Sequence, residues 1–205
     1  MAKSVAIQGF KSEAITYRER AVANLERQIG VYALCDLDGT PIYVGQSVDG
    51  IQSRVRRHLT SARSDIIANR QVDVWEIAWV MAWPAERDSI TRLEASLFHH
   101  FDASCALMNG SVPILPSDPI PFTRAAQILQ VMPSAEIDRR REPSARLPRQ
   151  IEHYGRLVDH YLNVKSSAEL RVSMEAHFAP LTKYHLRFLE QAGPAPSGSD
   201  DAKEQ

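Results

Sequence analysis

The spacing of apolar residues in the first part of the chain is that of a β-hairpin followed by a helix. Two short apolar runs, Val31–Cys35 and Pro41–Gly45, flank residues 36–39, which end in an Asp-Gly pair. Such a pair between two apolar runs predicts a hairpin, here with Tyr32 and Tyr43 on its two strands. The helix, from about residue 50, is predicted by the four-residue spacing of Ile51, Val55 and Leu59.

Three further segments are predicted to complete the sheet and to cover it. Residues 12–29 have the apolar spacing of an amphipathic helix. Residues 71–83 are apolar on both alternating faces, as in a central strand that is covered on both sides. A second helix is expected to start at Asp88 or Ser89. Its apolar face consists of Ile90, Leu93, Leu97, Phe98 and Phe101.

The chain beyond residue 112 has a different composition. Four prolines lie between residues 113 and 121, so residues 113–122 are predicted to form a semi-rigid connection. Residues 123–192 are predicted to be helical, and Gly193–Gln205 has the composition of a disordered tail. The expected helices span residues 123–132 and 147–164, then from Ser166 or Ser167 to 177, and finally 181–191.

These elements predict an α+β fold, an α/β sandwich with a small antiparallel central sheet between helices, followed by a helical C-terminal region. The predicted division places an N-terminal helical extension at residues 1–29 and the sheet-containing domain at 30–112. The connection, the helical region and the tail follow at residues 113–122, 123–192 and 193–205.

Composition points to an ordinary soluble protein. Hydrophobic residues make up 44 % of the 205 residues and charged residues 24 %, which is enough to build a core. We find no run of about 20 apolar residues that would span a membrane, and the N-terminus lacks the apolar region of a signal peptide. Cys35 and Cys105 are not spaced like the cysteines of a metal-binding or redox motif. Together these features predict a cytoplasmic protein.

The charge is balanced overall but locally uneven. The formal net charge is −1, yet residues 51–70 contain five arginines and one acidic residue, Asp65. Residues 139–149 contain five arginines and Glu142. Each cluster is equally consistent with a phosphate-contacting surface and with a solvated helix face.

Three polar residues occupy helix positions that normally face a core. Arg54 and His58 lie three and seven residues after Ile51, and Glu94 lies inside the apolar face of the second helix. A carboxylate there should cost several kcal/mol unless a cation accompanies it. Glu94 is therefore expected either to pair with an arginine such as Arg54 or to hold a metal.

Taken in order along the chain, these residues resemble the GIY-YIG nuclease family, in particular its restriction and homing endonucleases. The two naming motifs appear as Gly30-Val31-Tyr32 and Tyr43-Val44-Gly45, with valine in place of isoleucine in both. The resemblance covers about residues 28–110. Three further residues of the family's pattern have counterparts here. Its catalytic arginine matches Arg54, with His58 one helical turn later, its metal-binding glutamate matches Glu94, and its terminal asparagine matches Asn109.

The resemblance implies an endonuclease, a hydrolase that cuts phosphodiester bonds with one Mg²⁺ or Mn²⁺ bound at Glu94. Arg54 would contact the scissile phosphate, and Tyr32 is favoured as the base, assisted by His58 and Tyr43. Asn109 is expected to orient Glu94 or the hairpin. Candidate nucleic-acid contacts are Gly45, Gln46, Arg56, Arg57, Arg63, Arg139, Arg140 and Arg141.

DNA is the expected substrate, with RNA as an alternative, and a cut through both strands would favour a homodimer. A freestanding restriction or defence nuclease is the leading interpretation. The alternatives are a nuclease of DNA repair or recombination and a non-catalytic nucleic-acid-binding protein on the same fold. Purely structural roles are also open, with Tyr32 and Tyr43 packing in the sheet and His58 capping its helix.

Overall fold

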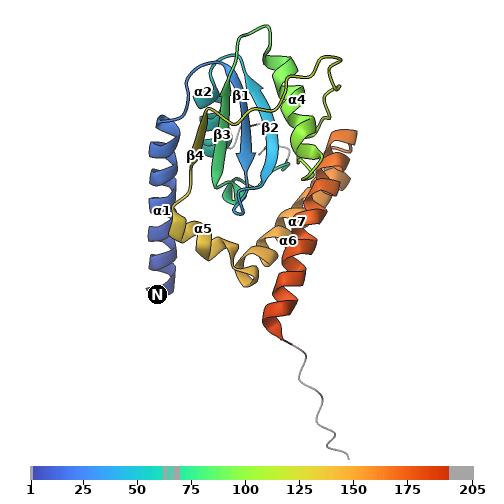
Figure 1. Cartoon of the computed structure of the whole chain (residues 1–205). Coiled ribbons are helices and arrows are strands. Elements are labelled where there is room, and N and C mark those ends of the chain that lie inside the picture. The colour runs from blue at the N-terminus through green and yellow to red at the C-terminus, as the bar shows by residue number, and fades with distance from the viewer. Residues whose placement is uncertain (1, 62–63, 65, 67–69, 194–205) are drawn as a thin grey trace, which may run out of the picture.

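A four-stranded antiparallel sheet forms the centre of the protein (Figure 1). The computed structural model describes residues 2–61, 64, 66 and 70–193, with side chains from residue 13 onward. The strands run in the order β2-β1-β3-β4, so that β2 and β4 form the two edges. This confirms the predicted α+β class. The strands are β1 (Gly30–Cys35), β2 (Pro41–Ser47), β3 (Trp79–Pro84) and β4 (Gln127–Gln130).

Strand β1 is buried on both faces, and its alternating side chains contribute to two separate cores. Tyr32 and Leu34 point into one core, and Val31 and Ala33 into the other. The predicted hairpin of β1 and β2 is confirmed. Its turn is closed by the carboxylate of Asp36, which accepts hydrogen bonds from two backbone amides of the turn, each at 2.9 Å.

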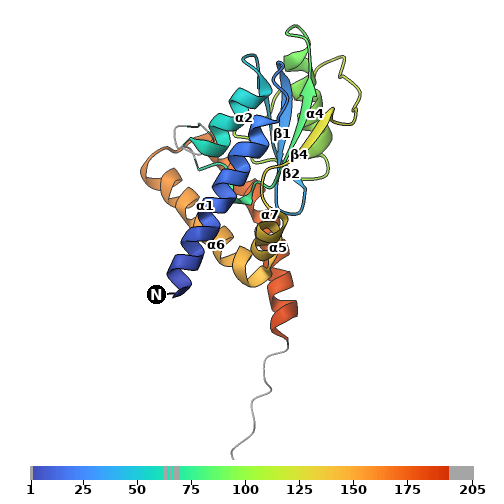
Figure 2. The same ribbon diagram turned by 90° about the vertical axis from the view of Figure 1, so that its left-hand side faces the viewer.

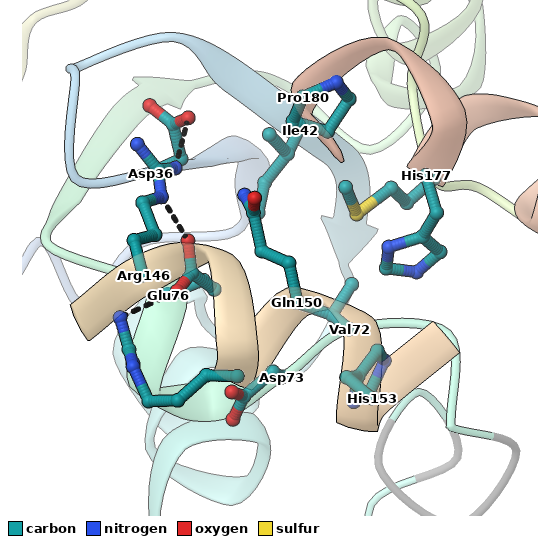
Figure 3. Close-up of a pocket in the computed structure, with 12 residues that line it drawn as sticks. Asp36, Ile42, Val72, Asp73, Glu76, Arg146, Gln150, His153, His177 and Pro180 are labelled. Atoms are coloured by element: carbon teal, nitrogen blue, oxygen red, sulfur yellow. Dashed lines mark hydrogen bonds and ion pairs between the residues drawn. The ribbon is translucent and has the colours of Figure 1, made fainter. Parts of the chain in front are cut away.

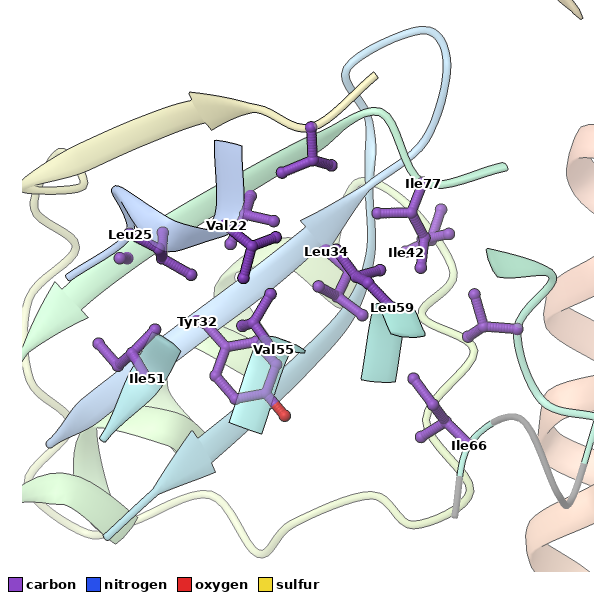
Figure 4. Packing of buried hydrophobic residues seen from close by; sticks show 14 of the residues in the cluster. Val22, Leu25, Tyr32, Leu34, Ile42, Ile51, Val55, Leu59, Ile66 and Ile77 are labelled. Atoms are coloured by element: carbon purple, nitrogen blue, oxygen red, sulfur yellow. The ribbon is translucent and has the colours of Figure 1, made fainter. Parts of the chain in front are cut away.

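Helices cover the two faces of the sheet. The first core is closed by α1 (Ala2–Ala23) and α2 (Ile51–Thr60), which lie side by side on the near side of the sheet in Figure 2. Helix α4 (Ile90–Asp102) closes the opposite core. Figure 4 shows the first core, where Val22 of α1, Leu25 just after it, and Ile51, Val55 and Leu59 of α2 pack on β1. The N-terminal helix thus begins earlier than predicted and ends six residues before residue 29.

The predicted strand over residues 71–83 is wrong in its first half. Strand β3 starts only at Trp79, and Val74–Glu76 form a single 3-10 turn. The carboxylate of Asp73 accepts a hydrogen bond from the backbone amide of Trp75 at 2.9 Å and so caps this turn. An apolar run alone does not distinguish the two conformations, because this local side-chain bond competes with strand pairing.

The helix predicted over residues 123–132 is also wrong, because β4 lies there. Strand β4 pairs with β3, with Gln130 opposite Trp79 and Gln127 opposite Ala82. The outer edge of β3 would otherwise expose unpaired backbone groups, and this long-range pairing overrides local helix preference. The chain beyond the proline-rich connection therefore returns to complete the sheet.

The C-terminal part is helical, as predicted, with different boundaries. It contains α5 (Ser134–Arg141), α6 (Pro143–Asn163) and α7 (Ala168–Ala192). The two helices expected over residues 166–177 and 181–191 are one helix, which continues through Pro180. Ser167 caps α7 as predicted, by accepting a hydrogen bond from the amide of Leu170. Residues 194–205 of the predicted tail lie outside the described residues, as does part of the 61–70 loop.

A buried arginine joins these helices to the hairpin. Arg146 of α6 is only 1 % exposed and forms ion pairs with Asp36 at 2.8 Å, Asp38 at 3.0 Å and Glu76 at 2.7 Å. Its guanidinium also lies 4.1 Å from the ring centroid of Tyr184 in α7. Figure 3 shows Arg146 between the hairpin turn and the 3-10 turn. The C-terminal helices are therefore anchored on the end of the hairpin by charge as well as by packing.

Candidate active site

Two tyrosines and a histidine meet under helix α2. The hydroxyl of Tyr32 on β1 lies 2.7 Å from Nε2 of His58 on α2. The ring of Tyr43 on β2 lies 6.4 Å from that of Tyr32 and 5.9 Å from that of His58, measured between centroids. Tyr32 and His58 are completely buried, whereas Tyr43 is partly exposed. The structure thus brings together three of the residues predicted for the site.

The close approach of the two tyrosines depends on Gly45. Tyr32 lies directly opposite Gly45 in the antiparallel pairing of β1 and β2. A Cβ atom at Gly45 would lie 2.6 Å from the Tyr32 hydroxyl and 2.9 Å from Cε1 of Tyr43. No side chain can be added at that distance without moving a tyrosine. The contact explains a glycine at this position by sterics, and its predicted contact with nucleic acid stays a prediction.

Arg54 and Glu94 approach from opposite faces of the sheet at its β2 edge. Arg54 is carried by α2, and Glu94 by α4, which packs against β2. Glu94 is partly buried, and this burial raises the pKa of its carboxyl group above the ordinary value. A hydrogen bond from the backbone of Gln46 and the positive charge of Arg54 act in the opposite direction and lower that pKa. The carboxylate is thus bound by a backbone amide and lies within range of the charge of a guanidinium.

Asn109 is bound to the hairpin. Its side-chain oxygen accepts a hydrogen bond from the backbone amide of Val44 at 3.0 Å, and its amide group donates to the carbonyl of Val44 at 2.7 Å. The preceding residue, Met108, donates its backbone N–H to the carbonyl of Ile42 at 2.7 Å. Residues 108–109 therefore pair with the outer edge of β2, much as another strand would. Asn109 was predicted to orient either Glu94 or the hairpin, and these contacts correspond to the second role.

The same edge positions Glu94. Backbone groups at positions two apart on a strand point to the same side, so the amides of Val44 and Gln46 both face outward from β2. The first amide is bound by Asn109 and the second by the Glu94 carboxylate. The side chain of Gln46 accepts a hydrogen bond from Thr91 of α4 at 3.3 Å. Strand β2 thus carries the Tyr43-Val44-Gly45 motif and also binds the Glu94 carboxylate.

The arginines that were predicted to contact nucleic acid fall into two groups, one on and after α2 and one on α5. Arg56 and Arg57 are exposed on α2, next to Arg54, whereas Arg63 lies outside the described residues. The three arginines of α5 have acidic partners. Arg139 and Arg140 pair with Glu136 at 2.7 and 2.5 Å, and Arg141 lies 3.3 Å from Asp38. Arg140 is also buried against Trp75.

These partners give the α5 arginines a structural role, and their contact with nucleic acid stays a prediction. Helix α5 also lies below the sheet in Figure 1, on the far side from α2. The larger cluster at residues 139–149 cannot act as one phosphate-binding surface, because Arg146 is buried among carboxylates.

Sequence reasoning missed Ser64. Its hydroxyl lies 2.6 Å from Nδ1 of His58, and its side chain is completely buried. The two ring nitrogens of His58 therefore face Tyr32 and Ser64, and this excludes a simple helix-capping role for the imidazole. A serine in a polar stretch after a helix carries no signal of such a contact.

The β1–β2 hairpin thus carries the two tyrosines, with Arg54 and His58 on the helix that covers it and Glu94 at the outer edge of β2. Comparison with family models gives the specific assignment: residues 28–106 match the GIY-YIG catalytic domain. These residues therefore form a GIY-YIG domain, the domain of a nuclease family, and the resemblance noted in the sequence is confirmed. Neither the curated proteins nor the solved structures yielded a match to the chain.

The structure contains no helix, within its described ranges, that is long and apolar enough to cross a membrane.

Proposed function

We propose that the protein is a divalent-metal-dependent endonuclease that hydrolyses phosphodiester bonds in DNA, acting as a freestanding restriction or defence enzyme. The observation that carries this proposal is the buried contact of Tyr32 with His58 beneath α2, together with Glu94 bound at the outer edge of β2 within range of the charge of Arg54. Hydrolysis of a phosphodiester needs a deprotonated water, a countercharge for the phosphate and stabilisation of the leaving oxygen. The four side chains match these three requirements.

Glu94 suits a hard divalent cation. Carboxylate oxygens are preferred ligands of Mg²⁺ and Mn²⁺, and a bound cation would offset the burial that raises the pKa of Glu94. Among the residues that the structure describes, no group of three or more His, Cys, Asp or Glu side chains is arranged to hold a metal. Glu94 would therefore hold the ion with water and phosphate oxygens as the other ligands. The ion would supply charge stabilisation for the leaving oxygen.

Arg54 would bind the scissile phosphate. A guanidinium offers two parallel donors to one phosphate, which an ammonium group cannot do. The charge of Arg54 lowers the pKa of Glu94, and in this proposal the two groups act on the same phosphate. The exposed Arg56 and Arg57 on the same helix would contact flanking phosphates and make binding dependent on salt.

Tyr32 is our candidate for the base, assisted by His58 and Tyr43. The Tyr32 hydroxyl is already hydrogen-bonded to an imidazole that can accept its proton. Tyr43 is the partly exposed member of the cluster and would contact the attacking water on the substrate side. The buried Tyr32 would then take the proton from that water when substrate closes over the site.

The test is a cleavage assay on supercoiled plasmid, linear duplex and single-stranded DNA, with Mg²⁺ or Mn²⁺ and with EDTA. We expect metal-dependent cutting by the parent and at least about 10³-fold slower cutting by Arg54→Ala and Glu94→Gln. Arg20→Ala and Glu19→Gln serve as matched controls, because both residues are exposed on α1 and lie outside the site.

Cutting of RNA in preference to DNA would replace the proposed substrate. DNA binding without any cutting, unaffected by metal, would instead support the non-catalytic interpretation. Equal cutting by the parent and both site variants would contradict the assignment of Arg54 and Glu94. Sedimentation of the protein with and without DNA would show whether a homodimer forms.

A further inference from the structure

The buried contact between Ser64 and His58 has no place in the roles assigned so far. Ser64 follows α2 by four residues, and its backbone amide donates to the carbonyl of Ser61 at 3.1 Å. Its hydroxyl then reaches Nδ1 of His58 at 2.6 Å. The result is a continuous row of hydrogen-bonding groups, Tyr32–His58–Ser64, with no exposed member.

A neutral imidazole carries one N–H, so its two neighbours determine which nitrogen holds the proton. If Nδ1–H donates to Ser64, Nε2 has a lone pair facing the hydroxyl of Tyr32 and can accept that proton. If Nε2 holds the proton instead, it donates to the phenolic oxygen and cannot accept from it. The partner at Nδ1 thus decides whether His58 can accept a proton from Tyr32.

We propose that Ser64 is a positioning residue, which accepts a hydrogen bond from Nδ1–H of His58 and so keeps Nε2 available to accept the Tyr32 proton. This proposal rests on the proposed nuclease function. The surroundings of the imidazole support it, because the rings of Tyr32 and Tyr43 lie 5.8 and 5.9 Å from it, and Tyr32 belongs to the apolar core that contains Val55 and Leu59. Ser64 and Tyr32 contact the two ring nitrogens, and in this proposal they set the orientation and the tautomer of His58.

The proton movements balance in the following order. The Tyr32 proton passes to Nε2 of His58, and the phenolate takes one proton from the attacking water. The water oxygen forms a bond to phosphorus while the bond from phosphorus to the 3′-oxygen breaks. The 3′-oxygen takes up a proton from solvent, and the imidazolium later returns its extra proton to solvent. Ser64 moves no proton in the net reaction, since it only shares the one on Nδ1.

The test compares Ser64→Ala with Ser64→Thr, which retains a hydroxyl, and with Ser53→Ala, an exposed serine on α2. The first measurement is the ¹⁵N chemical shifts of the His58 ring in metal-free protein, which report the tautomer whether or not the protein cuts DNA. We expect a protonated Nδ1 in the parent, in Ser64→Thr and in Ser53→Ala, and a shift toward protonated Nε2 in Ser64→Ala.

The second measurement is the pH–rate profile for DNA cleavage. Ser64→Ala should reduce kcat by about tenfold to a hundredfold with KM unchanged. It should also move the acid limb of the profile to lower pH, because the imidazolium loses the acceptor of its Nδ1–H. Ser64→Thr should recover most of kcat. A parent enzyme with protonated Nε2, or a Ser64→Ala variant with the parent's tautomer and profile, would overturn the proposal. If the parent cuts no DNA, the nuclease proposal fails, whereas the ring shifts still decide the role of Ser64.

Discussion

Nη2 of Arg146 lies 2.8 Å from Oδ2 of Asp36, a contact between residues 110 positions apart that fixes helix α6 on the turn of the β1–β2 hairpin. The same guanidinium donates to Asp38 and Glu76, so each of its three nitrogens donates to a carboxylate. Burial raises the pKa of Asp38, but its bonds to Lys183, Arg146 and Tyr184 outweigh that effect and hold the pKa at about 2. The carboxylate of Asp38 therefore stays ionised throughout the neutral range.

Replacing Arg146 with alanine should destabilise the protein severely. The change would leave buried carboxylates without their main cation, for which the expected loss is about 3–5 kcal/mol of the free energy of unfolding. Urea unfolding followed by circular dichroism measures it. Arg187→Ala is the matched control, because Arg187 lies 4.0 Å from Asp38 and is half exposed, and it should cost less than about 1 kcal/mol. Equal losses in the two variants would contradict the proposed anchoring role.

The hairpin and both flanking helices could be predicted because their signals are local. The Asp-Gly pair defines the turn, and Glu94 is conspicuous as a carboxylate within an otherwise apolar helix face. Strand β4 could not be predicted in this way, because residues 127–130 become a strand only by pairing with the edge of β3. The role of Arg146 was hidden for a similar reason. Among five nearby arginines, only tertiary contacts distinguish Arg146, which lies among carboxylates and is 1 % exposed, from the others.

His177 should make stability depend on pH below neutrality. Its Nε2 lies 2.8 Å from the carbonyl of Gln71, and burial, reinforced by the nearby His153, lowers its pKa from 6.5 to about 4. The unfolded chain therefore binds more protons between these two values, so the free energy of unfolding should fall as pH falls from about 6.5 to about 4. The loss attributable to this group is at most about 3 kcal/mol.

Urea unfolding of the parent and of His177→Gln at pH 7 and pH 5 tests this. Glutamine retains a donor for the carbonyl of Gln71 and does not titrate, so the variant should lose less stability between the two pH values. His185→Gln, a change at an exposed histidine of the same helix, should behave like the parent. A variant that loses as much stability as the parent would assign the pH dependence to other groups, such as His153.

Glu94→Gln should abolish cleavage and yet increase stability at pH 7. Because burial raises the pKa of Glu94, its ionised form is less favourable in the folded protein than in the unfolded chain. The neutral glutamine avoids this cost. The advantage should shrink as pH falls through the raised pKa of Glu94, where the parent carboxyl becomes neutral as well. Thermal unfolding across pH 4–8 measures the difference, and a variant less stable than the parent at pH 7 would show that the Gln46 and Arg54 contacts outweigh burial.

Gly45→Ala is the sharpest test of the geometry of the two tyrosines. The new methyl group would lie 2.6 Å from the Tyr32 hydroxyl, so Tyr32 must move away from His58 or the strands must separate. We expect cleavage to fall by at least about a hundredfold, since displacement of a catalytic group by about 1 Å has an effect of that size. Gly155→Ala is the matched control, because no atom lies within 4 Å of the added carbon on α6, and that change should stabilise its helix by about 0.5–1 kcal/mol. Full activity in Gly45→Ala would mean that the contact between Tyr32 and His58 is not needed for catalysis, and the base would then have to be sought at Tyr43.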